Sequence, residues 1–182
     1  MSLSPDLQER FARVRLLLMD VDGVLTDGRL FHFPGPDGTM VETKGFDSQD
    51  GMALRWLAWN NVDAGVISGR ISAATTERAR QLDIRYVYQG HIEKIPILDE
   101  IREKSGIAPE NIAYVGDDLT DIVVMRRVGL GIATANARPE VKRAAHYVTN
   151  VPGGSGAIRE VAELILQAQG HWAAILKKYE VE

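Results

Sequence analysis

The sequence predicts a Rossmann-like α/β fold in which a parallel β-sheet lies between two layers of helices. Short apolar runs of strand length alternate along the chain with longer amphipathic stretches of helical period. Two of the apolar runs end in clusters of aspartate, as expected where parallel strands deliver functional side chains to one edge of a sheet. With 182 residues, of which 45% are hydrophobic, the chain can bury one adequate core. We therefore expect residues 1–182 to form a single domain.

The expected elements follow this alternation in order. A first helix over 5–13 begins after Ser4, because Pro5 suits the first helical position, where a missing N–H is harmless. Strands are expected at 15–20, 62–68, 85–88, 112–116 and 130–133. Helices are expected at 50–60, 72–82, 93–106, 119–128 and 139–145. Strands that alternate with helices in this way indicate a mostly parallel sheet covered on both faces.

One segment departs from the alternation. Residues 29–46 contain two β-prone stretches around the turn-rich residues 34–38, which predicts a β-hairpin flap outside the main sheet. Only some twenty residues separate Thr26 from Phe46, which is too few for a separate cap domain. The C-terminal tail, about 170–182, carries Trp172, Ile175 and Leu176 at helical spacing. It can pack on its own domain or dock on a neighbouring subunit.

Composition excludes several classes of protein. The 21 Lys and Arg against 25 Asp and Glu give a net charge of −4, which argues against nucleic acid as the main partner. The chain has no cysteine, so disulfides and thiolate metal sites are excluded. Apolar runs are far shorter than the roughly 18 residues that a membrane span needs. We therefore expect a cytoplasmic protein without a membrane partner.

The first acidic cluster follows the first strand, as Asp20-Val21-Asp22-Gly23. Two carboxylates close together at the end of a buried strand are costly unless a cation compensates them. Oxygen ligands of this kind suit Mg²⁺, which usually takes one or two carboxylates plus phosphate oxygens. The alternative is that Asp22 and Gly23 make a turn, which Asp20 caps.

The second cluster follows the strand at 112–116 and contains Asp117, Asp118 and Asp121. Because the carboxyl ends of parallel strands meet at one edge, the two clusters can surround one ion. The alternative for Asp117 or Asp118 is capping of the next helix, whose N-terminus favours acids.

Two further sites at this edge suit an anionic ligand. The second main strand ends in Ser68-Gly69-Arg70, which offers a hydroxyl and a loop amide to a phosphate oxygen. Lys94 opens the helix after the third strand and can reach the same edge as a point charge. Taken alone, each is better explained by a turn or a solvated surface, and the order of the parts along the chain favours the phosphate site.

The order of these parts resembles the haloacid dehalogenase superfamily of phosphohydrolases, with Asp-x-Asp-Gly, Ser-Gly, a helix-opening lysine and Gly-Asp-Asp-x-x-Asp following successive strands. A closer resemblance, over nearly the whole chain, is to the 3-deoxy-D-manno-octulosonate 8-phosphate phosphatase family. The segments that carry it are 20–28, 49–51, 67–70, 88–90, 113–118, 153–160 and 167–170.

The resemblance implies Mg²⁺-dependent hydrolysis of that phosphomonoester in the synthesis of lipopolysaccharide precursors. Our hypothesis is that Asp20 is the nucleophile that forms an aspartyl-phosphate and Asp22 is the acid and base. The resemblance implies that Mg²⁺ is held by Asp20, the Asp22 backbone carbonyl and Asp117, with Asp121 behind them. Ser68, Gly69 and Lys94 are expected to hold the phosphate. The substrate contacts that it implies are Asp47, Ser48, Gln49, Asp50, Gly51, Arg55, Arg70, Arg78 and Lys94.

Other functions stay open at this point. Gln49 and Ser155 stand where many members of the family have arginine, which is compatible with another sugar acid, such as a sialic-acid-type nonulosonate 9-phosphate. Arg70 fits the octulosonate family better. Phosphoacceptor receiver domains also combine acids, a hydroxyl and a lysine, but their phosphoacceptor follows the third strand, which here ends in Tyr88-Gln89-Gly90 without an aspartate. The resembling family forms homotetramers in which the hairpins associate and a tail reaches the adjacent site.

Overall fold

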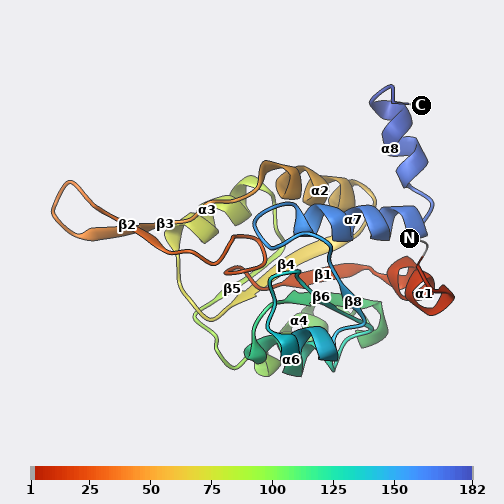
Figure 1. Ribbon diagram of the computed structural model, residues 1–182, viewed down its shortest axis with the longest axis horizontal. Coiled ribbons are helices and arrows are strands. Elements are labelled where there is room, and N and C mark those ends of the chain that lie inside the picture. Colours follow the sequence, from red (N-terminus) through yellow and green to blue (C-terminus); the bar gives the residue numbers. More distant parts are fainter. Residues whose placement is uncertain (1–2, 182) are drawn as a thin grey trace.

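The computed structural model describes residues 3–181 and contains a six-stranded parallel sheet of order β5-β4-β1-β6-β7-β8 (Figure 1). Its strands are β1 (Leu16–Met19), β4 (Asp63–Ser68), β5 (Tyr86–Gln89), β6 (Ile112–Gly116), β7 (Leu130–Ala133) and β8 (Tyr147–Val148). The first strand is central, since Leu16 is in register with Asp63 of β4 and with Ile112 of β6. The carboxyl ends of β4, β1 and β6 therefore lie side by side.

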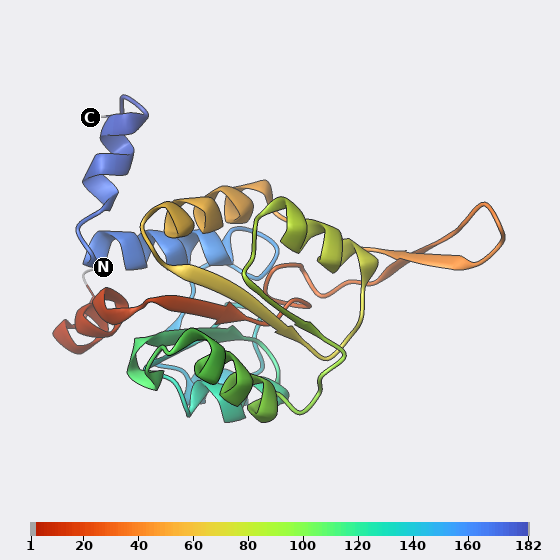
Figure 2. The ribbon, with the colours of Figure 1, turned by 180° about the vertical axis from the view of Figure 1, so that it is seen from behind.

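Helices cover both faces of the sheet, which confirms the predicted three-layer architecture (Figures 1 and 2). One face carries α1 (Pro5–Arg13), α2 (Ser48–Trp59), α3 (Ala73–Gln81) and α7 (Ala157–Ala168), and the other carries α4 (Ile95–Ser105), α5 (Ile122–Met125) and α6 (Pro139–Ala144). The side chains of β1 alternate between the two cores, with Leu17 and Met19 in one and Leu16 and Leu18 in the other. A strand buried on both faces has to be apolar throughout, as β1 is.

The predicted strands all occur, with ends that differ by at most one residue, and a sixth short strand, β8, was not predicted. The predicted helix over 119–128 is confirmed only at the four-residue α5, because a 3₁₀ turn, Leu119–Asp121, precedes it. A second 3₁₀ turn, Pro109–Asn111, precedes β6. The prediction of a single domain also covers Met1, Ser2 and Glu182, which lie outside the described residues.

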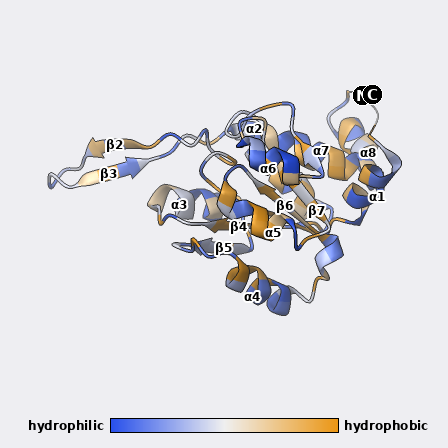
Figure 3. Cartoon of the chain, turned by 60° about the horizontal axis from the view of Figure 1, so that its bottom comes forward, coloured by the Kyte–Doolittle hydropathy of each residue, from blue (hydrophilic) through white to orange (hydrophobic). Residues whose placement is uncertain are grey.

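The hairpin flap consists of β2 (Phe31–Pro34) and β3 (Met40–Thr43), paired antiparallel and projecting from the domain (Figures 1 and 3). Phe33 is opposite Val41, and Phe31 is opposite Thr43, so these side chains share one face. Phe33 and Val41 are 57% and 51% exposed. The other face carries His32 opposite Glu42 and Pro34 opposite Met40. The hairpin therefore has one exposed apolar face and one face of mixed character.

The tail forms helix α8 (Trp172–Lys178), which packs on α2 and α7 of its own domain. The Trp56 indole N–H donates to the Tyr179 hydroxyl at 3.2 Å, and the rings of Trp56 and Trp172 meet edge to face, 5.6 Å between centroids. Figures 1 and 2 show α8 at the end of the molecule opposite the hairpin. Docking of this tail on a neighbouring subunit stays a prediction. Among the described residues, no helix has the length and apolar character required to cross a membrane.

Candidate active site

A pocket of about 180 Å³ opens at the carboxyl edge of the sheet. It is lined by Asp20, Asp22, Ser68, Gly69, Arg70, Ile92, Lys94, Asp117, Asp118 and Thr120. These residues follow β1, β4, β5 and β6. The two predicted acidic clusters, the predicted Ser-Gly pair and the predicted lysine are thus brought together.

The loop after β1 is held by hydrogen bonds and requires a glycine at position 23. The Asp20 N–H donates to the Val115 carbonyl at 3.0 Å, and the Asp20 carboxylate accepts from the Val21 N–H at 2.7 Å. Gly23 has φ +88°, in the left-handed region, and a Cβ there would lie 2.2 Å from Asp117 Oδ2. The glycine therefore allows the second acidic cluster to approach the first.

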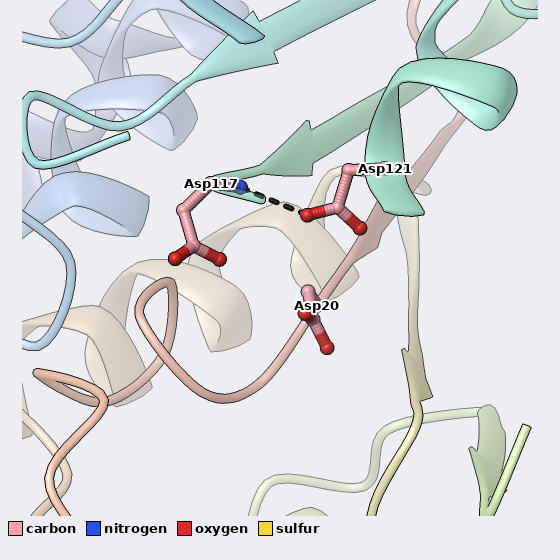
Figure 4. A group of neighbouring side chains, drawn as sticks. All are labelled: Asp20, Asp117 and Asp121. Atoms are coloured by element: carbon pink, nitrogen blue, oxygen red, sulfur yellow. Dashed lines mark hydrogen bonds between the residues drawn. The ribbon is translucent and has the colours of Figure 1, made fainter. Parts of the chain in front are cut away.

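The carboxylates of Asp20, Asp117 and Asp121 lie close together (Figure 4), and the first two line the pocket. One oxygen from each of Asp20, Asp117 and Asp121 lies within 4.8 Å of the others. Burial, followed by the charges of Asp121 and Asp20, raises the pKa of Asp117 to about 7. Burial also raises the pKa of Asp20 to about 6, although Lys94 opposes the shift.

This carboxylate cluster fits a hard divalent cation. Among the described residues, the buried Oδ1 atom of Asp117 has no hydrogen-bond partner, which is costly for a carboxylate oxygen. Lys94 is the lysine in ion-pair contact with the cluster, 3.2 Å from Asp20 Oδ2 and 2.7 Å from Asp121 Oδ1. One ammonium leaves an excess of negative charge, which an oxygen-ligated ion such as Mg²⁺ would neutralise.

Asp121 is fully buried, and both of its carboxylate oxygens are occupied. Oδ1 accepts from Lys94 Nζ and from the Tyr114 hydroxyl, each at 2.7 Å. Oδ2 accepts from the backbone N–H groups of Asp117 at 2.9 Å and Asp118 at 3.1 Å. Asp121 thus orients the lysine and the second acidic loop. Its place behind the metal ligands stays a prediction. The role of Tyr114 was not predicted, because the sequence of a buried strand does not show which of its side chains contacts a site.

The capping alternative is correct for one acid of the second cluster. The Asp118 carboxylate accepts from the Leu119 N–H at 2.7 Å, and the structure makes Asp118 the N-cap of the 3₁₀ turn. Asp117 points instead toward the other cluster (Figure 4).

Asp22 lies in a network of charges that the sequence did not indicate. Lys44 Nζ forms an ion pair with Asp22 Oδ1, and Arg70 Nε lies 3.8 Å from Asp22 Oδ2. Glu42 forms an ion pair with Arg70 and lies 3.5 Å from Lys44 Nζ. Glu42 and Lys44 come from the root of the hairpin. The only signal in the sequence is the polar residue at every second position there.

The residues predicted to contact substrate fall into separate places. Arg70 lines the pocket, whereas Arg78 and Ser48 line a neighbouring hollow that also includes Lys44 and Phe46. Asp47 caps α2 by accepting from the Gln49 N–H at 2.6 Å, and its carbonyl accepts from Arg78 at 3.1 Å. The exposed side chain of Arg55 donates to the Gln81 carbonyl at 3.0 Å. Substrate contacts by these residues stay predictions.

Asp50 has a structural contact of its own. It is 1% exposed, and its Oδ1 accepts from the Arg159 N–H at 2.7 Å, at the N-terminus of α7. Burial raises the pKa of Asp50 to about 6. The neighbouring Gly51 is also buried, with the Arg78 guanidinium where a Cβ would stand. Asp50 and Gly51 thus pack α2 against α7 and α3.

Comparison with known families and proteins gives a consistent picture. Residues 64–159 match the model of the haloacid dehalogenase-like hydrolases. The 3-deoxy-D-manno-octulosonate 8-phosphate phosphatase KdsC of Salmonella typhimurium is 43% identical, over 92% of this chain and 87% of that protein.

Solved structures of such phosphatases are also similar. The enzyme from Moraxella catarrhalis, in complex with magnesium ion, phosphate ion and KDO, has a TM-score of 0.91 and 36% identity, over 97% of this chain and 99% of that one. The Yersinia pestis 3-deoxy-D-manno-octulosonate 8-phosphate phosphatase has a TM-score of 0.88 and 41% identity, over 94% and 90% of the two chains.

Proposed function

Because the chain belongs to the haloacid dehalogenase-like hydrolases, and within them to the 3-deoxy-D-manno-octulosonate 8-phosphate phosphatases, we propose that it hydrolyses this phosphomonoester with Mg²⁺. The observation that carries the proposal is the meeting of Asp20, Asp117 and Lys94 in one pocket at the carboxyl edge of the sheet. A nucleophilic carboxylate, a cation site and an ammonium are the parts that phosphoryl transfer requires.

In the first step, a carboxylate oxygen of Asp20 attacks phosphorus, and the bond from phosphorus to the sugar oxygen breaks. Asp22 gives its proton to the departing oxygen. Lys94, Ser68 and Gly69 hold the equatorial oxygens of the phosphoryl group, because all three line the pocket beside Asp20. Ser68 is buried, and Lys94 Nζ lies 3.2 Å from Asp20 Oδ2. The products of this step are the free sugar acid and an aspartyl-phosphate.

In the second step, Asp22 takes a proton from water, and the oxygen of that water attacks phosphorus. The bond between phosphorus and Asp20 breaks, which releases inorganic phosphate and restores the carboxylate. Asp20, Asp117 and the Asp22 carbonyl would hold the metal ion, which neutralises charge on the phosphoryl group when it is bound. Asp121 keeps Lys94 and the Asp117 loop in place.

The substrate is inferred from the family and from local charge. Arg70 lines the pocket and is a candidate contact for the sugar-acid carboxylate. The alternative substrate is a sialic-acid-type nonulosonate 9-phosphate, which Gln49 and Ser155 leave open. With either substrate, the reaction is hydrolysis of a sugar-acid phosphomonoester. If the substrate is the octulosonate, the reaction belongs to the synthesis of lipopolysaccharide precursors.

A panel of sugar-acid phosphates tests this assignment. With Mg²⁺, we expect kcat/KM for octulosonate 8-phosphate to exceed that for nonulosonate 9-phosphates by about 100-fold, the scale on which a pocket discriminates against one additional carbon group. Excess chelator should abolish release of phosphate from every member of the panel. Activity confined to a 9-phosphate would favour the alternative, and a single phosphorylation without turnover would indicate a receiver module.

We further propose that the apolar face of the hairpin joins copies of the chain into a homotetramer, as the family resemblance implies. Phe31, Phe33 and Val41 expose a contiguous apolar face on a two-stranded sheet, and such a sheet is marginal in water by itself. Other hairpins of the same kind would cover this face.

Phe33→Glu should therefore break the assembly, because it places a charge in the centre of the apolar face. Light scattering should give a mass near four times 20.1 kDa for the wild type and near 20.1 kDa for the variant. Val123→Glu, at an exposed apolar residue of α5, is the matched control and should leave the mass unchanged. A wild-type chain that is monomeric at micromolar concentration would contradict the proposed assembly.

A further inference from the structure

We propose that Lys44 is a positioning residue for Asp22, which holds that carboxylate in the orientation needed to protonate the leaving oxygen. The inference rests on the proposed phosphatase reaction and adds to it a residue of the hairpin. Lys44 directly follows β3, outside the segments that carry the family motifs.

The side chain of Lys44 is buried and held by ion pairs. Its side chain is 1% exposed, and its ammonium pairs with Asp22 Oδ1. A buried ammonium without partners is strongly unfavourable, so the pair constrains both side chains. Glu42, two residues earlier, lies 3.5 Å from the same ammonium. The ammonium of Lys44 thus lies between Asp22 of the loop after β1 and Glu42 of the hairpin root.

Arg70, the other cation beside Asp22, is held much less firmly. Its side chain is 47% exposed, its Nε atom is 3.8 Å from Asp22 Oδ2, and its short contact is with Glu42. An exposed ion pair of this kind contributes little. Lys44 is therefore the group that fixes Asp22, with Oδ1 engaged and Oδ2 on the side of the arginine that lines the pocket.

Lys44 acts through Asp22 and not on the substrate. Asp22 and Arg70 line the pocket around Asp20, whereas Lys44 lines the adjacent hollow with Phe46 and Arg78. A contact behind Asp22 can change only the two steps in which Asp22 takes part. Only one of them depends on the leaving group: a sugar alkoxide needs a proton and a nitrophenolate does not, because nitrophenolate leaves as a stable anion, whereas removal of a proton from water is common to both substrates.

The two kinds of leaving group provide the test. Lys44→Met keeps the unbranched chain as far as the ε position and removes the charged ammonium. The quantity to compare is kcat/KM, which reports the steps up to loss of the leaving group and leaves out hydrolysis of the aspartyl-phosphate. With Mg²⁺, we expect kcat/KM for octulosonate 8-phosphate to fall on the order of 100-fold, the scale of a general-acid contribution, and kcat/KM for p-nitrophenyl phosphate to change less than about threefold. Equal losses of kcat/KM on both substrates, or no loss on either, would overturn the inference.

Two further variants complete the experiment. If Lys44→Met does not fold by circular dichroism, Lys44→Gln, which keeps a hydrogen-bond donor, takes its place with the same expectation. In an Asp22→Asn background, Lys44→Met should lower sugar-phosphate turnover by less than about threefold more, since residues acting as one unit are not additive. A full additional 100-fold loss would mean that Lys44 acts elsewhere.

The same measurements distinguish failure of the proposed function from failure of the role of Lys44. If the wild type hydrolyses neither substrate with Mg²⁺, the proposed function fails. If it hydrolyses both and Lys44→Met lowers both alike, only the role of Lys44 fails.

Discussion

Replacing Asp20 by asparagine should reduce release of phosphate by a factor on the order of 10⁴ or more, the scale seen when a nucleophile is removed. An amide oxygen is a far weaker nucleophile than a carboxylate, and asparagine has the same shape, so the pocket should persist. The Val21 N–H can still donate to the oxygen at position 20. The measurement is phosphate release from the sugar phosphate at saturating Mg²⁺.

The control for this variant is Asp99→Asn, which removes an exposed carboxylate of α4 that pairs with Arg102. It should leave turnover unchanged. Thermal unfolding of Asp20→Asn should show no loss of stability, because the variant removes a carboxylate whose burial raises its pKa to about 6. Substantial turnover by Asp20→Asn would exclude Asp20 as the nucleophile.

Replacing Asp117 by alanine should raise the Mg²⁺ concentration required for half-maximal activity by about 100-fold or more, because a direct ligand is expected to matter at least as much as the partners that orient it. Without metal, the same variant should be more stable than the wild type at pH 8. The reason is that the wild type buries an ionised Asp117 whose Oδ1 has no hydrogen-bond partner among the described residues. Each kcal/mol gained should raise the Tm by about 2 to 4 °C in a domain of this size.

The pH dependence of this effect has a definite sign. The pKa of Asp117 is 3.8 when unperturbed and about 7 in the folded chain. The contribution of a group with a raised pKa is fully present below pH 3.8 and is lost as the pH rises through about 7. The metal-free wild type should therefore lose stability across this window, and Asp117→Ala should lose less.

Added Mg²⁺ should offset the loss, since it binds the deprotonated carboxylate. The increase in Tm produced by Mg²⁺ should be larger at pH 8 than at pH 5 in the wild type and small in Asp117→Ala at both. An unchanged metal titration in Asp117→Ala would contradict its assignment as a ligand.

The parts of the fold that follow from simple periodicity were predictable. The strands over 112–116 and 130–133 are confirmed residue for residue. The helix Ala157–Ala168 was not predicted, although Ile158, Val161 and Ile165 repeat at helical spacing and are buried. The helix expected over 119–128 is shorter than predicted because the chain first makes a 3₁₀ turn, which brings Asp121 under Gly116. A Cβ at Gly116 would lie 2.3 Å from Asp121 Cβ, so this approach depends on the glycine.

Some residues of the candidate site could also be predicted from the sequence, and others could not. Asp20 and Asp117 could be placed together from the sequence alone, because adjacent parallel strands end at one edge. Lys44, Glu42 and Tyr114 could not, because their contacts depend on how the hairpin root folds back and on which face of β6 meets Lys94. Asp50 was expected at the substrate, and its visible role is to bind the N-terminus of α7. Burial of that kind arises from helix packing and leaves no local pattern.

The hairpin also has a consequence for how an assembly can be built. Within residues 3–181, β2 and β3 pair only with each other, so the outer edge of each strand presents unsatisfied backbone donors and acceptors. Such edges are templates for uncontrolled strand addition unless a closed cycle of copies covers them. In the proposed tetramer, a ring that lacks one copy would carry two uncovered strand edges, whereas the complete ring would carry none. Dilution or truncation that opens the proposed ring would therefore expose these edges and favour aggregation.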